Sequence, residues 1–156
     1  MTVTIRPLRE SDAYTSVKWR NDPEVFKYTG NTYTHIISID DELEWIRKVI
    51  NNPCDYRCAI LADGVYVGNI YLTGINDGEA DYHIFIGDRS CWGKGIAKLA
   101  SEEIIKYGFK QLHLNSIKLR VRTENKRAYI LYQTLGFIEV ESDDNWISMK
   151  LLNELD

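Results

Sequence analysis

The spacing of apolar and polar positions changes along the chain, and each spacing predicts a type of element. Residues 56–62, 65–75 and 80–87 are three runs rich in β-branched and aromatic side chains, which is typical of strands. Asp63-Gly64 lies between the first two runs and Asn76-Asp77-Gly78 between the last two, and both are turn sequences. The middle of the chain therefore predicts a meander of three strands.

Helical spacing precedes this meander. Ser11-Asp12 can cap a helix that runs to about Arg20, and Asn21 begins a short second helix with Pro23 in its first turn, where the missing N–H costs nothing. Ser38 and the acidic residues after it begin a third helix, which ends near residues 51–53. We therefore expect three helices between the first strand and the meander.

The second half of the chain alternates between helices and strands. From Lys94, one face of a long helix carries the apolar residues Ile96, Leu99, Ala100, Ile104 and Tyr107. The other expected elements are strands over residues 2–8, 116–122, 137–141 and 146–151, and a helix over residues 125–135. The order β-α-α-α-β-β-β-α-β-α-β-β predicts a single mixed α/β domain over residues 1–156.

Composition excludes several classes of protein. The chain has 156 residues, 44% hydrophobic and 27% charged, with a net charge of −4 and no basic block, so we expect one domain and no nucleic-acid partner. Because no apolar run approaches 18 residues, we expect no membrane span or signal peptide. Cys54, Cys58 and Cys91 have no ligand-like spacing, which favours a reduced cytoplasmic protein without a metal site.

The clearest candidate for chemistry is the passage from the strand ending at Ile86 into the helix after Gly95. Gly93 and Gly95 have no Cβ, so a bulky anion can approach the backbone closely. The helix N-terminus adds unpaired N–H groups and partial positive charge, which favour phosphate or pyrophosphate. The alternative is that both glycines serve only a tight strand-to-helix turn.

A second segment extends this pattern. Asn125 opens a helix, Tyr132 follows about two turns later, and Gly136-Phe137 closes it. Together, this segment and the glycine turn resemble the GCN5-related N-acetyltransferase (GNAT) superfamily, and the resemblance covers nearly the whole chain. It implies a mixed, mostly antiparallel sheet with helices on both faces, and transfer of an acetyl group from acetyl-CoA to an amine.

The resemblance also implies which residues bind acetyl-CoA. The family's turn has Gln or Arg at its first position; here it reads Trp92-Gly93-Lys94-Gly95-Ile96-Ala97, with main-chain donors for the pyrophosphate. Trp92 departs from the family pattern, and we expect it to support the turn by packing. The backbone of Phe85, Ile86 and Gly87 corresponds to the strand that pairs with the pantetheine arm. Asn125 caps its helix and, by resemblance, bonds the coenzyme.

Acetyl transfer to an amine needs a proton acceptor for the ammonium and a donor for the leaving thiolate. By resemblance Tyr132 is the donor; the alternative is a tyrosine of the helix core. For the acceptor the chain offers Asp81 and His83, which alternation places on one face of their strand. Ordered water is the third possibility, and Glu79 belongs to the preceding turn.

The acceptor amine is left open by the sequence. Trp19-Arg20-Asn21-Asp22-Pro23 resembles relatives that acetylate amino sugars on nucleotides, and parts of it occur in relatives that acetylate protein N-termini. The acidic residues Asp40, Asp41, Glu42 and Glu44 suit either a helix N-terminus or a polyamine, and the aromatics Phe26, Tyr28, Tyr33 and Trp45 suit either packing or stacking on a substrate. A non-catalytic coenzyme-binding module is a further alternative, and relatives are commonly homodimers.

Overall fold

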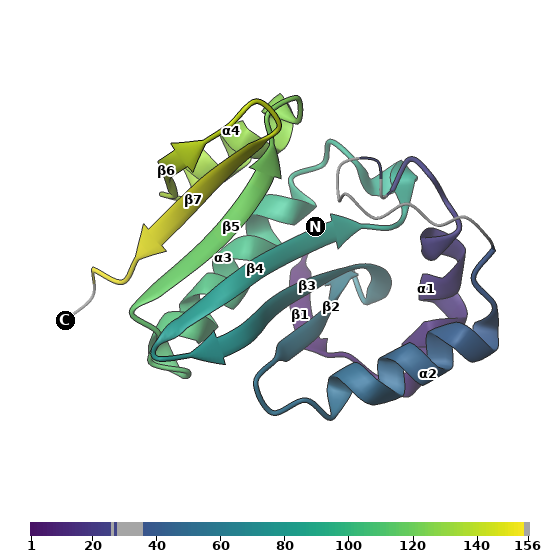
Figure 1. Cartoon of the computed structure of the whole chain (residues 1–156). Helices are drawn as coiled ribbons and strands as arrows, with labels where there is room; N and C mark the ends of the chain where they lie inside the picture. Colours follow the sequence, from purple (N-terminus) through teal and green to yellow (C-terminus); the bar gives the residue numbers. More distant parts are fainter. Residues whose placement is uncertain (26, 28–35, 155–156) are drawn as a thin grey trace.

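A computed structural model describes residues 1–25, 27 and 36–154, and within them one sheet of seven strands in the order β1-β2-β3-β4-β5-β7-β6 (Figure 1). The strands are β1 (Val3–Pro7), β2 (Tyr56–Ala62), β3 (Val65–Asn76), β4 (Glu79–Ile86), β5 (Ser116–Arg122), β6 (Ile138–Ser142) and β7 (Trp146–Leu152). The α-helices are α1 (Ala13–Arg20), α2 (Ile39–Ile50), α3 (Ile96–Lys110) and α4 (Lys126–Thr134), and the 3-10 helices are η1 (Glu10–Asp12) and η2 (Arg89–Cys91).

The expected mixed, mostly antiparallel sheet is confirmed, since among the described strands only β4 and β5 pair in parallel. The two turn sequences of the meander adopt the left-handed backbone that they favour, with φ of 49° at Asp63 and 51° at Asp77. Among the described residues no helix is long and apolar enough to cross a bilayer.

The short helix expected at Asn21 is wrong for the residues described there, because residues 21 and 23–25 form turns. Asn21 ends α1 instead: its side-chain amide donates to the carbonyls of Val17 and Ile37, at 3.0 and 2.9 Å. The Asp22 carboxylate accepts from the backbone N–H of Glu24 at 3.1 Å. The polar side chains expected to start a helix thus end one and hold the next turn.

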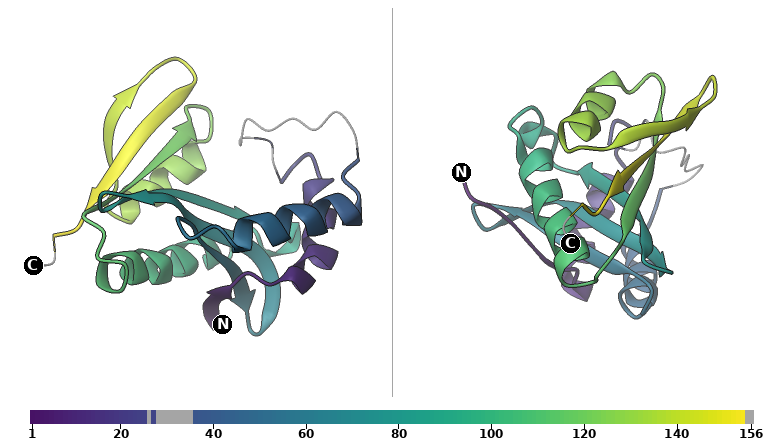
Figure 2. Two further views of the ribbon diagram at one scale, coloured as in Figure 1. Left: turned by 60° about the horizontal axis from the view of Figure 1, so that its bottom comes forward. Right: turned by 90° about the vertical axis from the view of Figure 1, so that its left-hand side faces the viewer.

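Helices cover both faces of the sheet, and the strand residues alternate between two cores (Figure 2). Ile60, Ile70 and Tyr82 belong to the core under α3 and α4, whereas their neighbours Ala59 and Tyr71 belong to the core under α1 and α2. We call the face toward α3 and α4 the donor side, and the face toward α1 and α2 the acceptor side.

Helix α3 fixes the donor side. Ile96, Ala100 and Ile104 are buried at four-residue spacing against the sheet, and Tyr107 stacks on Tyr56 with ring centroids 4.2 Å apart. Replacing Ile104 by alanine would cost about 2 to 5 kcal/mol, as for other large-to-small changes in a core. The expectation that Leu99 shares this buried face is wrong, because its side chain is 41% exposed at the margin of the apolar stripe.

Strands β4 and β5 separate soon after they meet. They pair only through Glu79, Ala80 and Asp81 of β4, opposite residues 116–118 of β5. Beyond Asp81 the two strands diverge. In the described part of the chain, residues 82–86 of β4 therefore have no strand partner on the side that faces β5. The fold therefore has a gap between β4 and β5 in the middle of the sheet, which connects its two helix-covered faces.

Candidate active site

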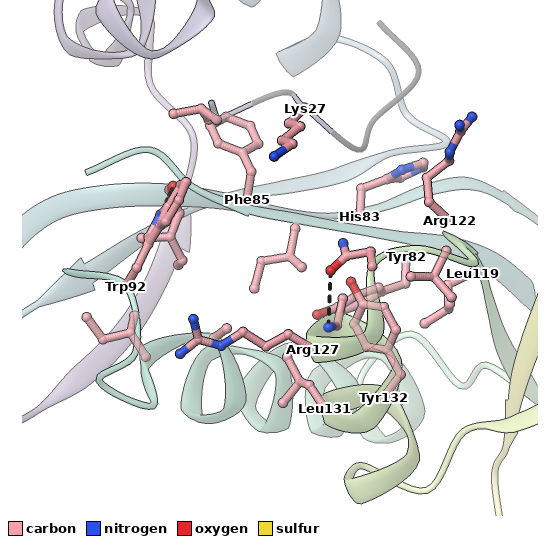
Figure 3. Close-up of a pocket in the computed structure, with 18 of the residues that line it drawn as sticks. Lys27, Tyr82, His83, Phe85, Trp92, Leu119, Arg122, Arg127, Leu131 and Tyr132 are labelled. Atoms are coloured by element: carbon pink, nitrogen blue, oxygen red, sulfur yellow. Dashed lines mark hydrogen bonds between the residues drawn. The ribbon is translucent and has the colours of Figure 1, made fainter. Parts of the chain in front are cut away.

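A cavity of about 1450 Å³ occupies this gap (Figure 3). Its described lining comes from the diverging part of β4, the turn before α3, the first turns of α4, β5, and side chains of β2, β3 and β7. Figure 3 shows Tyr82, Leu131, Tyr132 and Arg127 on one side of β4, and Lys27, Phe85 and His83 on the other. The cavity thus connects the donor side with the acceptor side. Among the described residues, no group of His, Cys, Asp and Glu side chains could hold a metal ion.

The glycine turn has the conformation that only glycine adopts readily. Gly93 and Gly95 have φ of +76° and +79°. Gly95 is the N-cap of α3 and no side chain caps it, so the first N–H groups of α3 have no intrahelical or capping partner. The Arg127 side chain reaches across from α4, with its Nη2 3.0 Å from the position of a Cβ on Gly93. Backbone donors and cations therefore surround one end of the cavity.

Trp92 stabilises the turn by a hydrogen bond. Its indole N–H donates to the carbonyl oxygen of Ile86 at 2.8 Å, although the side chain is 41% exposed. The bond ties the turn to the end of β4. A glutamine or arginine at this position could also donate, which explains how tryptophan replaces the family's residue.

The edge of β4 presents peptide groups to the gap at alternate residues. The N–H of Gly87 donates to the carbonyl of Val67 at 2.8 Å, which makes Ile86 and Gly68 a non-hydrogen-bonded pair. The N–H and C=O of Ile86 therefore point away from β3 and toward the gap. Those of Ile84 do the same two residues earlier, whereas the peptide groups of Phe85 face β3.

Gly87 is a glycine for a reason that the sequence does not reveal. A Cβ on Gly87 would lie 1.9 Å from Cδ2 of Trp19, so the indole of α1 occupies that position. Glycine at this position therefore makes room for the indole of Trp19. It lies behind the cavity wall, where β4 meets α1.

Asn125 and Tyr132 are positioned by α4. Asn125 is the N-cap, and its side-chain oxygen accepts from the N–H of Ala128 at 3.3 Å. Tyr132 lies two turns later, with its ring 5.6 Å from that of Tyr82 and 6.0 Å from that of Phe137. Burial raises the pKa of Tyr132 to about 12. Tyr132 belongs to the lining of the cavity, so its hydroxyl can donate to a ligand there.

Asp81 and His83 lie together on the acceptor side, as alternation predicts. Asp81 stands where β4 and β5 still pair, with Oδ1 4.0 Å from Nζ of Lys118. His83 lies beyond the pairing, and its Nε2 is 3.1 Å from Oγ1 of Thr73. Desolvation lowers the pKa of His83, a trend that Arg57 reinforces and Asp81 opposes. The imidazole is therefore neutral at pH 7.

Glu79 does more than form a turn. It begins β4 and contacts Lys150, Lys118 and Ser116, at 3.0, 3.1 and 2.8 Å. Its hydrogen bonds to Lys150, Ser116 and Lys118 lower its pKa to about 2. These contacts join β4, β5 and β7 at the closed end of the gap.

The Trp19–Asp22 motif ties the acceptor side to the rest of the protein. Trp19 packs on Gly87, and Asp22 forms an ion pair with Arg89 of η2 at 2.9 Å. Arg20 pairs with the buried Glu42 of α2 at 3.1 Å, and Ser16 donates to the same carboxylate. The motif therefore has a structural role in holding α1, α2 and the glycine turn together.

The acidic cluster of α2 divides into separate roles. Glu42 is buried with Arg20, and Asp41 forms a capping box with Ser38. Asp40 and Glu44 are exposed. Of the aromatics expected near a substrate, Trp45 lies in the cavity lining beneath Arg20, at 4.0 Å. Phe26, Tyr28 and Tyr33 lie outside the described residues.

Several lining residues were missed by sequence reasoning. Arg57 lies over the ring of Tyr71 at 4.5 Å, and Arg120 and Arg122 lie over Trp146 at 4.5 and 5.0 Å. The alternation of buried and polar residues along 116–122 could have placed both β5 arginines on the acceptor side. Nothing in the sequence links them to Trp146, which comes from β7.

Comparison with known proteins now adds to this geometry. The family model described as an acetyltransferase (GNAT) domain matches residues 2–138. The chain belongs to this GNAT acetyltransferase family. The spermidine N(1)-acetyltransferase of Escherichia coli is 30% identical over 139 residues, covering 87% of this chain and 73% of that protein. The acetyltransferase PseH of Campylobacter jejuni is 25% identical over 129 residues, covering 83% and 78%.

A solved structure agrees with the fold of this GNAT protein. The spermidine N-acetyltransferase of Vibrio cholerae, in complex with CoA and spermine, superposes with a TM-score of 0.85 at 26% identity, covering 96% of this chain and 95% of that one. The chain is thus an acetyl-CoA-dependent N-acetyltransferase, as the two sequence motifs predicted.

Proposed function

We propose that this acetyltransferase moves the acetyl group of acetyl-CoA to a primary amine of a small molecule, an amino sugar or a polyamine, which enters from the acceptor side. One observation carries the proposal. The cavity passes through the sheet between β4 and β5, with Tyr132 at its donor side and His83 at its acceptor side.

The donor side fits the coenzyme in charge and shape. The uncapped start of α3, with Gly93 and Gly95, offers main-chain N–H groups to the pyrophosphate, and Lys94 and Arg127 add positive charge. The peptide groups of Ile84 and the N–H of Ile86, which face the gap, can pair with the amides of a pantetheine arm, while the Ile86 carbonyl accepts from Trp92. Asn125, in the same lining, can bond the arm while capping α4.

The chemistry follows from the two faces. The amine first loses a proton, and we assign its acceptor to His83, because this imidazole is neutral at pH 7 and lies beyond the point where the strands pair. Asp81 beside it favours the imidazolium that results. The amine nitrogen then forms a bond to the thioester carbonyl carbon, and the C–S bond breaks with its electron pair on sulfur. The nitrogen gives its second proton to solvent, from which the Tyr132 oxygen regains the proton that it donates. Tyr132, protonated below about pH 12, donates to that sulfur.

Two of the similar proteins bear names that refer to spermidine, which supports an amine acceptor. A small acceptor also suits the lining, which contains the aromatic rings of Trp45, Tyr71 and Phe85 as well as His83.

Calorimetry with acetyl-CoA, followed by thiol release with amines in the same sample, tests the proposal. Polyamines, amino sugars, nucleotide-linked amino sugars and short peptides form the panel. We expect binding, and release with a small amine. Binding with no release on any amine would contradict catalysis and favour a coenzyme-binding module, and release on peptides alone would contradict a small acceptor.

A further inference from the structure

The acceptor side of the cavity carries more positive than negative charge in its described lining. Arg57 comes from β2, and Arg120 and Arg122 come from β5, on the face of the sheet that also carries His83. Ile117, Leu119 and Val121 alternate with these β5 residues and are buried in the donor-side core, which fixes the direction of the arginines.

Arg120 and Arg122 are held close together by one ring. Their guanidinium carbons lie 4.5 and 5.0 Å from the centroid of Trp146, which faces Arg122 across the β5–β7 ladder. Cation–π contact fixes both side chains at the rim of the cavity. Because the two groups repel each other, a site that holds both favours an anion between them.

Nearby carboxylates compensate this charge only partly. Elsewhere on this face, Arg20, Arg57 and Lys118 each have a carboxylate within 3.2 Å. Arg122 has Glu124 at 3.5 Å, and Arg120 is exposed with Trp146 as its described contact. Asp143 is close enough for both arginines to lower its pKa, but its carboxylate accepts from the backbone N–H groups of Asn145 and Trp146.

The two arginines lie on β5 across the gap from His83. From the last paired residue of β5, Lys118, they lie about 7 and 13 Å along the strand, at roughly 3.3 Å per residue. His83 lies two residues beyond Asp81 on β4, just as Arg120 lies two residues beyond Lys118 on β5, so the two face each other across the gap. An acceptor whose amine reaches His83 can therefore place an anionic group across the gap, against Arg120 and Arg122.

We propose, on the basis of the function proposed above, that the acceptor amine carries an anionic group, phosphate or carboxylate, which Arg120 and Arg122 bind against Trp146. Guanidinium forks match both anions in a bidentate manner, and the ring restricts the fork to one plane. A polyamine carries cations instead of an anion, and these same arginines repel it. This chain thus differs in acceptor charge from the relatives named for spermidine.

Matched acceptors test the charge preference. Glucosamine is compared with glucosamine 6-phosphate, putrescine with ornithine, and spermidine is included, with thiol release as the readout. We expect the anionic member of at least one pair to have a kcat/KM about tenfold or more above its partner and above spermidine. The sugar pair reports on phosphate and the second pair on carboxylate. Calorimetry with the preferred anionic acceptor and CoA-loaded protein gives a readout independent of turnover.

Variants then assign the preference to the arginines. Arg120→Gln/Arg122→Gln should remove the advantage and weaken binding of the preferred anionic acceptor about tenfold, while acetyl-CoA affinity stays the same. Arg120→Glu, at an exposed position, is a second variant if the pair fails to fold, and Lys48→Gln on the exposed face of α2 is the control. Equal rates within each pair, a preference for spermidine, or an anionic advantage that survives in the variants would overturn the inference. Acetyl-CoA binding without transfer to any amine would instead overturn the proposed function, and the inference with it.

Discussion

The two sides of the β4–β5 gap are built by different means. The donor side uses backbone: two glycines with positive φ, an uncapped helix start and the peptide edge of β4. The acceptor side uses side chains from β2, β4, β5 and β7 that meet only in the folded protein. A site made of backbone groups tolerates many side-chain substitutions as long as the turn keeps its conformation, so it suits the substrate that the whole family shares. Side-chain sites change with single substitutions, so they suit the substrate that differs between members.

Removing the carboxylate beneath the acceptor side should have the largest effect. We expect Glu42→Ala to lower the free energy of unfolding by about 3 to 5 kcal/mol, because it leaves the Arg20 guanidinium in a buried place without that carboxylate. Urea denaturation measures the loss. Glu44→Ala, exposed on the same helix, should stay within about 0.5 kcal/mol, and an equal cost for both would contradict the buried pair.

Removing the donor-side acid should slow turnover while leaving the coenzyme bound. For Tyr132→Phe we expect kcat to fall about 100-fold, which corresponds to about 2.7 kcal/mol, with the Kd of acetyl-CoA within about twofold of wild type. Thiol release and calorimetry give the two numbers. Tyr129→Phe is the control, because Tyr129 is on the same helix but bonds Glu139 outside the cavity. A fall of the same size in the control would remove Tyr132 from its role.

The contact between Gly87, just after β4, and Trp19 of α1 should have the next largest effect. Gly87→Ala should lower the free energy of unfolding by about 2 kcal/mol, since the added Cβ meets the indole of Trp19. Gly95→Ala has open space around it and should cost only the left-handed backbone, about 1 kcal/mol. In a Trp19→Leu background the cost of Gly87→Ala should shrink. An unchanged cost there would show that something other than the indole excludes the side chain.

The smallest expected effect lies in the titration of His83. Because desolvation lowers its pKa, the midpoint of protonation should lie below pH 6.5, so the imidazole is free to accept a proton at pH 7 and loses that capacity as the pH falls through the folded pKa. Proton NMR of the histidine rings measures the midpoint of His83, whose signal is assigned by its loss in His83→Ala. Asp81→Asn should move the midpoint lower still, and His83→Ala should reduce kcat about tenfold. A midpoint above 6.5 would contradict the assignment.

The same contrast explains what the sequence could predict. The bounds of β2 and β5, the cap at Asn125 and the glycine turn follow from local patterns, and each is confirmed. The helix at Asn21 was wrong because its polar side chains bond residues distant in sequence, such as Ile37. The reason for Gly87 and the grouping of Arg120 with Trp146 could not be read, because each depends on a contact between separate elements.

The contact of Trp19 with Gly87 also limits how this enzyme can be re-engineered. To change the acceptor, one would naturally replace the whole segment from the end of α1 to the start of α2 by that of a relative. Trp19 and Arg20, at the end of α1, and Asp22 just after it contact Gly87, Glu42 and Arg89, respectively. They therefore belong to the part of the protein that supports the pyrophosphate turn. A replacement segment that starts after Asp22 and stops before Ser38 keeps these contacts. A segment that starts at Trp19 also replaces the side chain that packs against Gly87, so it must supply another side chain that fits there.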